Sequence, residues 1–521
     1  MTLPLKKTGF IAPLILISLA VIFGGYIRLG FVFQETFPLN DGGLFYTMTS
    51  ELISNGFRIP ATTSYNHLQI PFAYPPLQFY IAGLLSTLFK WNLLDIFRIF
   101  PAVIACLCIP AFYLLARELL RNELHAALAT LIFSLTPASF DWLIMGGGVT
   151  RAPAFLLALL ALVSIYRLYT RKEKGYIIST ALLASLAVLS HPETALHTAA
   201  SALVFFMFFG RNKSGILRSL VVAGLVLVCT SPWWLNALNQ HGIAPFLSAG
   251  QTGWHGVLAV FKLFFANQYN EYQITPITIL ALVGLFIFLA QRKFFLPVWF
   301  LVIFLSEPRS APLFTSPIIA IFAAFSLIQI LNLLNGMEKK PGSETDLSLL
   351  FSGRLSKILF GILFAQWIFS SYAIVINLAN GYFLDDSEMN AFNWVKKNTS
   401  PDSRFIVISG NAPFTDPISE WFPAMTDRLS LGTAQGHEWV DGKAFNTTLE
   451  DSLALQQCAT SSLDCIKDWS VTNAFPYNYV FVDIAGTNEY PTALTVLMSK
   501  SGDYQAVYDS EGVVIFEVIG D

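Results

Sequence analysis

Residues 10–46 read FIAPLILISLAVIFGGYIRLGFVF and then QETFPLNDGGLFY, and this stretch decides the fold. Its first part, 10–33, is almost wholly apolar and exceeds the roughly 20 residues that cross the hydrocarbon of a membrane. A carboxylate, Asp41, follows soon after this apolar segment ends. Because the segment is too long for a signal peptide and ends without a small-x-small cleavage site, we expect an uncleaved first span.

The remainder of the chain repeats the apolar pattern. Of its 521 residues 54% are hydrophobic and 12% are charged, whereas a soluble protein carries roughly 25% charged residues. The composition therefore predicts an α-helical polytopic membrane protein. Its twelve candidate apolar segments are 10–33, 76–90, 98–117, 124–140, 153–170, 176–193, 195–210, 216–238, 275–291, 294–306, 311–333 and 357–379.

Charge divides the chain into two parts. Residues 1–379 hold 14 acids and 24 bases, whereas residues 380–521 hold 20 acids and 7 bases. Hydrophobicity also falls at about residue 380. We therefore expect a transmembrane domain over 1–379 and a separate acidic, water-soluble domain over 380–521.

Basic residues near span ends predict the topology, because they prefer the cytoplasmic side. Six Lys/Arg clusters hold 17 of the 24 basic residues of 1–379. All six fall on one side only if 76–90, the shortest clean segment, lies in the outer interface instead of crossing. The prediction is about eleven spans, a cytoplasmic N-terminus, an extracytoplasmic C-terminal domain and a long first external loop, 34–97. We expect the plasma membrane as its location.

The C-terminal part has an α/β pattern. Helices are predicted at 387–398, 448–457 and 490–500, and strands at 404–409, 479–483 and 513–518. Cys458 and Cys465, seven residues apart, either form a disulfide outside the cytosol or remain free thiols. The other three cysteines, Cys106, Cys108 and Cys229, lie in apolar segments and are expected to be packing residues.

The predicted topology places eight acids of the membrane domain on its external side, and a general base for chemistry on that face should be among them. They are Glu35, Asp41, Glu51, Asp95, Asp141, Glu193, Glu271 and Glu307. Asp41 precedes Gly42-Gly43, so its carboxylate either caps the helix that follows or serves as a base or metal ligand at the membrane surface.

Three motifs of the first loop, Asp41-Gly42-Gly43-Leu44-Phe45-Tyr46, Asn55-Gly56-Phe57-Arg58-Ile59-Pro60 and Tyr74-Pro75-Pro76-Leu77, resemble the GT-C-fold glycosyltransferases. That family includes protein O-mannosyltransferases, the lipid A aminoarabinose transferase and the oligosaccharyltransferase catalytic subunit. The resemblance implies transfer of a sugar from a polyprenyl phosphate or pyrophosphate on the non-cytoplasmic face. It nominates Asp41 as the catalytic base or as a metal ligand. Where the aminoarabinose transferase has Lys before Pro-Pro-Leu, this chain has Tyr74, which we take as substrate-binding.

The second external loop supplies Asp141, three consecutive glycines at 146–148, and Arg151. The resemblance implies that Asp141 assists catalysis and, with Asp41, holds a divalent cation, magnesium or manganese. The glycines indicate a close backbone approach, to phosphate among other groups. Arg151 either binds phosphate, anchors the interface or pairs with Asp141.

Two further turns carry polar groups to the outer face. His191 and Glu193 either line the site or form a capped helix end after Pro192. Arg309 is the candidate for gripping a lipid phosphate, and the alternative is a Glu307–Arg309 pair that closes a tight turn.

Aromatic residues appear in two other places. Trp254-His255 and the segment Asn267–Tyr272 suit sugar binding or a membrane-interface belt. In the tail, 391–399 resembles the start of the external domain of the oligosaccharyltransferase, but its Trp-Trp-Asp-Tyr-Gly acceptor reader is missing. Oligosaccharide transfer to Asn is therefore not predicted. The side chains in its place either touch an acceptor or pack the domain, and they are Glu420, Trp421, His437 and Trp439.

The sequence contains no Walker, dinucleotide-binding, zinc or nucleophile-elbow motif, which argues against an ATP-driven pump and a cytosolic nucleotide-sugar enzyme. The leading prediction is an inverting glycosyltransferase with Asp41 as base and a polyprenyl-linked donor. The acceptor is a glycan, lipid or protein, membrane lipids are partners, and nucleic acid is not expected. The alternatives are a transporter or lipid flippase, which needs polar residues inside the spans, and a non-catalytic scaffold.

Overall fold

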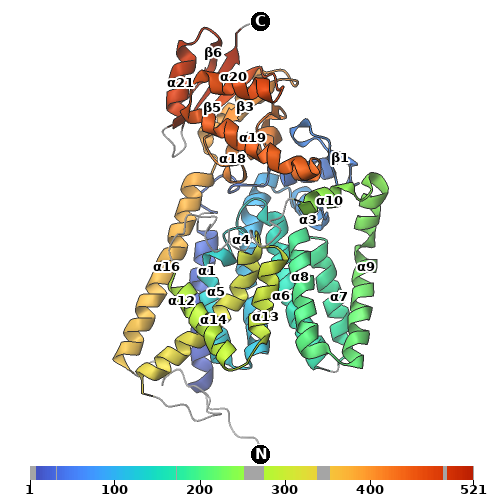
Figure 1. Ribbon diagram of the computed structural model, residues 1–521, viewed down its shortest axis with the longest axis vertical. Helices are drawn as coiled ribbons and strands as arrows, with labels where there is room; N and C mark the ends of the chain where they lie inside the picture. Colours follow the sequence, from blue (N-terminus) through green and yellow to red (C-terminus); the bar gives the residue numbers. More distant parts are fainter. Residues whose placement is uncertain are drawn as a thin grey trace, which may run out of the picture.

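The computed structural model describes residues 8–30, 32–171, 173–251, 275–336, 353–484 and 490–519. Upright helices stand side by side, and the C-terminal region covers one end of this bundle (Figure 1). The polytopic helical fold is confirmed. The upright helices are α1 Thr8–Leu29, α4 Leu93–Leu120, α5 Glu123–Ser134, α6 Gly148–Thr170, α7 Gly175–Val188, α8 Pro192–Phe205, α9 Lys213–His241, α12 Pro276–Ala290, α13 Phe295–Ser306, α14 Ala311–Leu334 and α16 Arg354–Tyr382.

Seven of the described helices are long and apolar enough to cross a membrane: α1, α4, α6, α8 with its π-helical extension Phe206–Gly210, α9, α14 and α16. The other four upright helices, α5, α7, α12 and α13, have 12 to 15 residues. At 1.5 Å per residue they reach about 18–22 Å, less than the roughly 30 Å of the hydrocarbon core. The count of eleven spans therefore stays a prediction.

The first loop folds at the end of the bundle that faces the C-terminal region. Helix α3 buries Phe79 and Ala82 and exposes Leu88 and Phe89 at 71% and 60%. A short helix with one apolar face outward suits a position in the membrane interface, as the charge pattern predicts for 76–90. The elements of this loop are α2 Gly43–Ser54, β1 Thr62–Thr63, β2 Ile70–Pro71 and α3 Leu77–Phe89.

Arg28, inside α1, anchors the loop between α5 and α6, the second of the loops predicted to be external. Its guanidinium donates to the carbonyl of Ser134 at 2.8 Å and to the hydroxyl of Ser139 at 3.1 Å. It also lies over the ring of Phe140, 4.6 Å from the centroid. A fully buried arginine needs such partners, because an unpaired charge at this depth is costly. The loop that follows α5 is thus fixed to the first helix.

The C-terminal region is α/β, with a five-stranded sheet in the order β4-β3-β5-β7-β6. β3 is parallel to β4 and β5, and β7 is antiparallel to β5 and β6. The predicted helices and strands all appear, and sequence reasoning missed α18, β4, α20 and β6. The elements are α17 Asp386–Asn398, β3 Arg404–Ile408, α18 Pro417–Thr426, β4 Leu429–Ser430, α19 Phe445–Gln457, α20 Leu463–Thr472, β5 Tyr479–Asp483, α21 Tyr490–Lys500, β6 Tyr504–Asp509 and β7 Val513–Val518.

The two faces of this sheet belong to different cores, since alternate residues of a strand point to opposite sides. Ile406 and Ile408 pack in a core of the C-terminal region alone, with residues of α19, α20 and α21. Phe405 and Val407 belong to the core that also contains Phe45 of the first loop. The C-terminal region therefore shares a hydrophobic core with the loop that carries Asp41.

The cysteines divide as follows. Cys458 and Cys465 form a disulfide with a Cα–Cα distance of 5.6 Å, so the pairing alternative holds. Cys108 is buried, as expected of a packing residue, whereas Cys229 is exposed on α9 and does not pack. The aromatic stretch 254–272, with Glu271, and the polar loop 338–347 lie outside the described residues.

Candidate functional site

The first and second loops that the sequence predicts to be external meet through their backbones. The N–H of Gly146 donates to the carbonyl of Leu39 at 2.8 Å, and the N–H of Gly147 donates to the carbonyl of Asp41 at 3.0 Å. A Cβ at position 147 would lie 2.5 Å from Oδ2 of Asp41. The predicted close approach at these glycines is therefore real, and the group approached is Asp41.

Arg151 binds Asp41 through two parallel hydrogen bonds. Nη1 donates to Oδ2 at 2.8 Å and Nη2 donates to Oδ1 at 2.9 Å. Nε of Arg151 donates to the carbonyl of Trp142, whose ring lies 5.0 Å from the guanidinium carbon. The paired side chains are 16% and 14% exposed. This fork geometry is the strongest form of an ion pair, and it answers the open question about Arg151: its carboxylate partner is Asp41.

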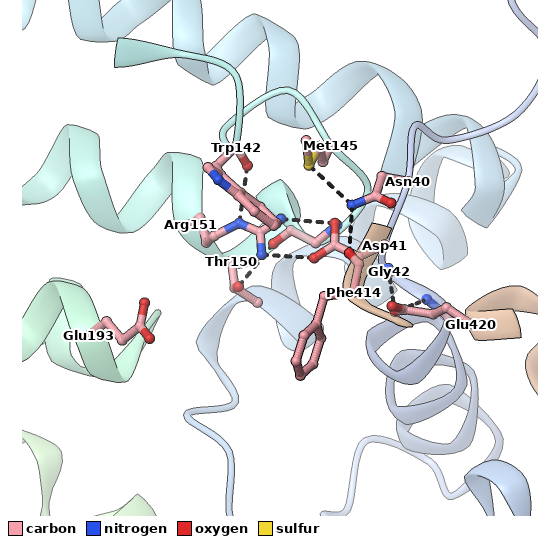
Figure 2. A network of polar contacts seen from close by, with 12 residues as sticks. Asn40, Asp41, Gly42, Trp142, Met145, Thr150, Arg151, Glu193, Phe414 and Glu420 are labelled. Carbon is pink, nitrogen blue, oxygen red and sulfur yellow. Dashed lines mark hydrogen bonds and ion pairs between the residues drawn. The ribbon is translucent and has the colours of Figure 1, made fainter. Parts of the chain in front are cut away.

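Of the two roles left open for Asp41, capping of the following helix is wrong. Gly42 is the N-cap of α2 and adopts φ 131, and α2 has no cap from its own neighbouring side chains. Oε1 of Glu420 accepts instead from the N–H of Gly42 at 2.7 Å and from that of Gly43 at 3.1 Å. Figure 2 shows Asp41 turned toward Arg151, with Glu420 on the other side of the loop.

Helix α18 holds this loop at further points. Nε1 of Trp421 donates to the carbonyl of Asn40 at 2.7 Å, and the hydroxyl of Tyr65 donates to the carbonyl of Glu420 at 2.7 Å. Burial and, second, the charge of Asp41 raise the pKa of Glu420 to about 8. From the sequence, Glu420 and Trp421 could either contact an acceptor or pack the C-terminal region. The tail helix packs directly on the residues that flank Asp41.

A second ion pair joins α8 to the turn before α14. Nη2 of Arg309 pairs with the carboxylate of Glu193, and the N–H of Arg309 donates to Glu307 at 3.3 Å. Glu307 is 6% exposed and Glu438 of the C-terminal region lies close enough to act on the charge of Arg309. The predicted contact between Glu307 and Arg309 is present, but it joins the carboxylate of Glu307 to the backbone N–H of Arg309. The guanidinium of Arg309 faces Glu193 instead.

His191 forms the capped helix end that the sequence allowed. Its Nδ1 accepts from the N–H of Thr194 at 3.3 Å, and Pro192 occupies the first helical position. Burial lowers the pKa of His191 to about 4 against the opposing field of Glu193, and Arg151 lowers it further. The ring is therefore neutral at physiological pH.

Tyr74 lies between the two ion pairs. Its hydroxyl is 3.2 Å from Oγ1 of Thr150, and its ring packs 5.8 Å from Trp439 and 6.3 Å from His191. Burial raises the pKa of Tyr74. Its hydroxyl is therefore a neutral hydrogen-bonding group. The structure thus brings six sequence-predicted residues into one electrostatically connected cluster: Asp41, Tyr74, Arg151, His191, Glu193 and Arg309.

Asp141 lies next to Trp142, which contacts Arg151 of this cluster. Asp141 is 8% exposed, and its Oδ1 accepts from the N–H of Trp142 at 2.7 Å. Trp142 in turn covers Arg151. A catalytic role for Asp141, or a place as second carboxylate beside Asp41, stays a prediction.

The donor set around Asp41 does not favour a resident metal. Both carboxylate oxygens of Asp41 already accept from Arg151, a cation. Among the residues that the structure describes, no group of three or more His, Cys, Asp or Glu side chains is placed to hold a metal ion. Magnesium or manganese stays a prediction, and no step below depends on it.

Solved structures with this fold are known. ArnT from Cupriavidus metallidurans in the apo state matches with a TM-score of 0.53 at 13% identity, over 96% of this chain and 97% of that protein. The same protein bound to undecaprenyl phosphate matches with a TM-score of 0.51 at 13% identity, over 98% of both chains. The arabinofuranosyltransferase AftD from Mycobacteria matches with a TM-score of 0.55 at 13% identity, over 97% of this chain but 40% of that protein. The resemblance to the GT-C fold is thus confirmed.

The sequence was also compared with protein families and with curated proteins. A family described as "6-pyruvoyl-tetrahydropterin synthase related domain; membrane protein" matches residues 73–334. No curated protein matches the sequence significantly.

Proposed function

We propose a function from the premise that this chain belongs to the membrane-protein family described as 6-pyruvoyl-tetrahydropterin synthase related domain and has the GT-C fold. The proposed function of the protein is that of a glycosyltransferase, which moves a sugar from a polyprenyl phosphate or pyrophosphate to an acceptor. The observation that carries the proposal is the buried Asp41–Arg151 pair, held where the two external loops meet. Binding of undecaprenyl phosphate by the structural neighbour ArnT supports the choice of a polyprenyl donor.

The reaction is assigned to the non-cytoplasmic face of the plasma membrane. The six basic clusters favour a cytoplasmic N-terminus. The loop that carries Asp41 contains α3 and β1, which lie at the end of the bundle next to the C-terminal region, and Glu420 of that region contacts Gly42. The Cys458–Cys465 disulfide supports an oxidising compartment for that region.

Asp41 is the proposed base, and its pairing with Arg151 has a consequence for the mechanism. In the structure both carboxylate oxygens of Asp41 accept charge-assisted hydrogen bonds from Arg151, so both are occupied before a substrate binds. Phosphate is also a bidentate partner for arginine. The donor phosphate therefore competes for Arg151, and Asp41 becomes available as base only when the donor is bound.

The chemical step is then a single displacement. Asp41 accepts the proton of the acceptor hydroxyl, whose oxygen attacks the anomeric carbon of the donor sugar. The bond from that carbon to the phosphate oxygen breaks, and the lipid phosphate leaves with the electron pair. General base catalysis contributes roughly 10²–10⁴-fold, and arginines that neutralise the leaving group supply a large further part.

Arg309 is the second proposed phosphate ligand. In the structure its guanidinium faces Glu193, so the phosphate would replace one anionic partner with another. The neutral Tyr74 and His191 have their rings in contact and provide hydrogen-bonding groups near the two ion pairs without further charge.

The test uses the purified full chain and undecaprenyl-phosphate-linked sugars offered singly. Transfer is measured as release of undecaprenyl phosphate together with a labelled product. Asp41→Asn should lower transfer by at least about 10²-fold. Glu35→Gln, an acid of the same loop whose backbone lies against Arg98, is the matched control and should retain transfer. Full activity of the Asn variant would remove Asp41 from the mechanism.

A further inference from the structure

Glu420 is a buried carboxyl that the proposed reaction does not use. It is 5% exposed and lies on α18, and its Oε1 accepts from two backbone N–H groups that belong to a loop 378 and 377 residues away. These two hydrogen bonds connect the C-terminal region to the residues that directly follow Asp41.

The first loop cannot provide this cap itself. Asp41 faces Arg151, and the next two residues have no side chains. The glycines are needed for the contact, because a Cβ on Gly43 would lie 2.5 Å from the carbonyl oxygen of Glu420 and one on Gly42 would lie 3.1 Å from the ring of Trp421. Positions 42 and 43 are thus shaped to receive α18.

The contact fixes the backbone on both sides of Asp41. Trp421 holds the carbonyl of Asn40, and Glu420 holds the N–H groups of Gly42 and Gly43. Every peptide unit from 40 to 43 therefore has a bond to α18 or to the second loop. A carboxylate whose backbone is fixed in this way can be aimed to within a fraction of an ångström, as catalytic geometry requires.

We propose that Glu420 is a positioning residue, through which docking of the C-terminal region sets the orientation of Asp41. The proposal rests on the proposed function, because it assigns the C-terminal region a part in that reaction. To accept the hydrogen bonds of Gly42 and Gly43, the side chain of Glu420 needs an acceptor oxygen and not a negative charge. The charged groups around it are Asp41, Arg151 and Glu438, and burial together with Asp41 keeps its carboxyl largely protonated at neutral pH.

This distinction makes glutamine the informative replacement. Glu420→Gln keeps the acceptor oxygen and the side-chain length, so it should behave as the wild type. Glu420→Ala leaves the N–H groups of Gly42 and Gly43 without their acceptor. Trp421→Phe is a second probe, since it keeps most of the ring but removes the bond to Asn40.

The first measurement does not depend on activity. Hydrogen exchange of a peptide covering 39–46 is followed in the full chain. Exchange should become roughly tenfold faster in Glu420→Ala, the effect of losing a helix cap, and stay unchanged in Glu420→Gln. Unchanged exchange in the Ala variant would overturn the proposal, whatever the enzyme transfers.

The second measurement is the split between kcat and KM. In Glu420→Ala, kcat should fall by about 10²-fold while KM for the lipid donor changes little, because Arg151 and Arg309 remain. Glu420→Gln should restore kcat. Wild-type kcat in the Ala variant, or equal loss in both variants, would overturn the positioning role. If Glu420→Ala does not fold, Trp421→Phe should show faster exchange and reduced kcat in its place. A wild type inactive on every donor would refute the proposed function, and the exchange measurement would still decide the contact.

Discussion

The Asp41–Arg151 pair can be tested as an energetic unit with a double-mutant cycle. The variants are Asp41→Asn, Arg151→Gln and the two combined. Arg151→Gln leaves a carboxylate that is 14% exposed without its cation and should cost about 3 kcal/mol of unfolding free energy. Asp41→Asn removes charge from two hydrogen bonds of 2.8 and 2.9 Å and should cost about 2 kcal/mol.

The double variant has neither buried charge, so its cost should be about 3 kcal/mol and the coupling energy about 2 kcal/mol. Unfolding titrations in mixed micelles measure these free energies. The control is the more exposed Asp95–Arg98 pair, where Asp95→Asn should cost less than about 1 kcal/mol. A coupling energy below about 0.5 kcal/mol would refute the reasoning, since independent sites give that result.

Three further expectations concern topology, the disulfide and pH. Cysteines introduced at positions 343 and 450 should be labelled from opposite sides of the membrane; labelling from the same side would contradict the eleven-span topology. Cys465→Ser should lower the unfolding free energy by about 2 kcal/mol, and reductant should then have no further effect on the melting temperature. The depressed pKa of His191 means that the unfolded chain binds its proton first. Stability should therefore fall as pH drops from about 6.5 to about 4, by up to about 3 kcal/mol, and His191→Asn should flatten this part of a melting-temperature profile.

Much of the fold follows from short-range features of the sequence. A span is defined by the length of an apolar run, and a strand such as 479–483 by a few consecutive apolar residues, so both can be predicted from local segments. Charge counts and its short length predict that segment 76–90 does not cross the membrane, and the exposed apolar face of α3 agrees with that position. The short α5 shows the limit of this reasoning, because the predicted segment 124–140 includes Pro137, which starts a separate short helix.

Several residues of the candidate site could also be predicted from the sequence. Glu193 is a candidate because a charged group at the end of an apolar segment is costly unless it is paired or functional. The family resemblance nominates Asp41, and the forked, permanently charged guanidinium nominates Arg309 as a phosphate ligand. The ion-pair and hydrogen-bond partners of these residues could not be predicted from the sequence. The sequence leaves three roles open for Arg151, and it offers helix capping as one of two roles for Asp41, whereas the acceptor at that helix start is Glu420.

The sequence by itself determined which segments are apolar over the length of a span and which polar residues stand at their ends, because the length of an apolar run is a local property. Only the tertiary structure decided the pairs, since Arg151 is 110 residues from Asp41 and Glu420 is 378 residues from Gly42. Each pair forms because packing of a shared core brings α18 and the second loop against the first loop. An ion pair or a cap depends on distances of about 3 Å, and chain separation carries no information about such distances until the core has formed.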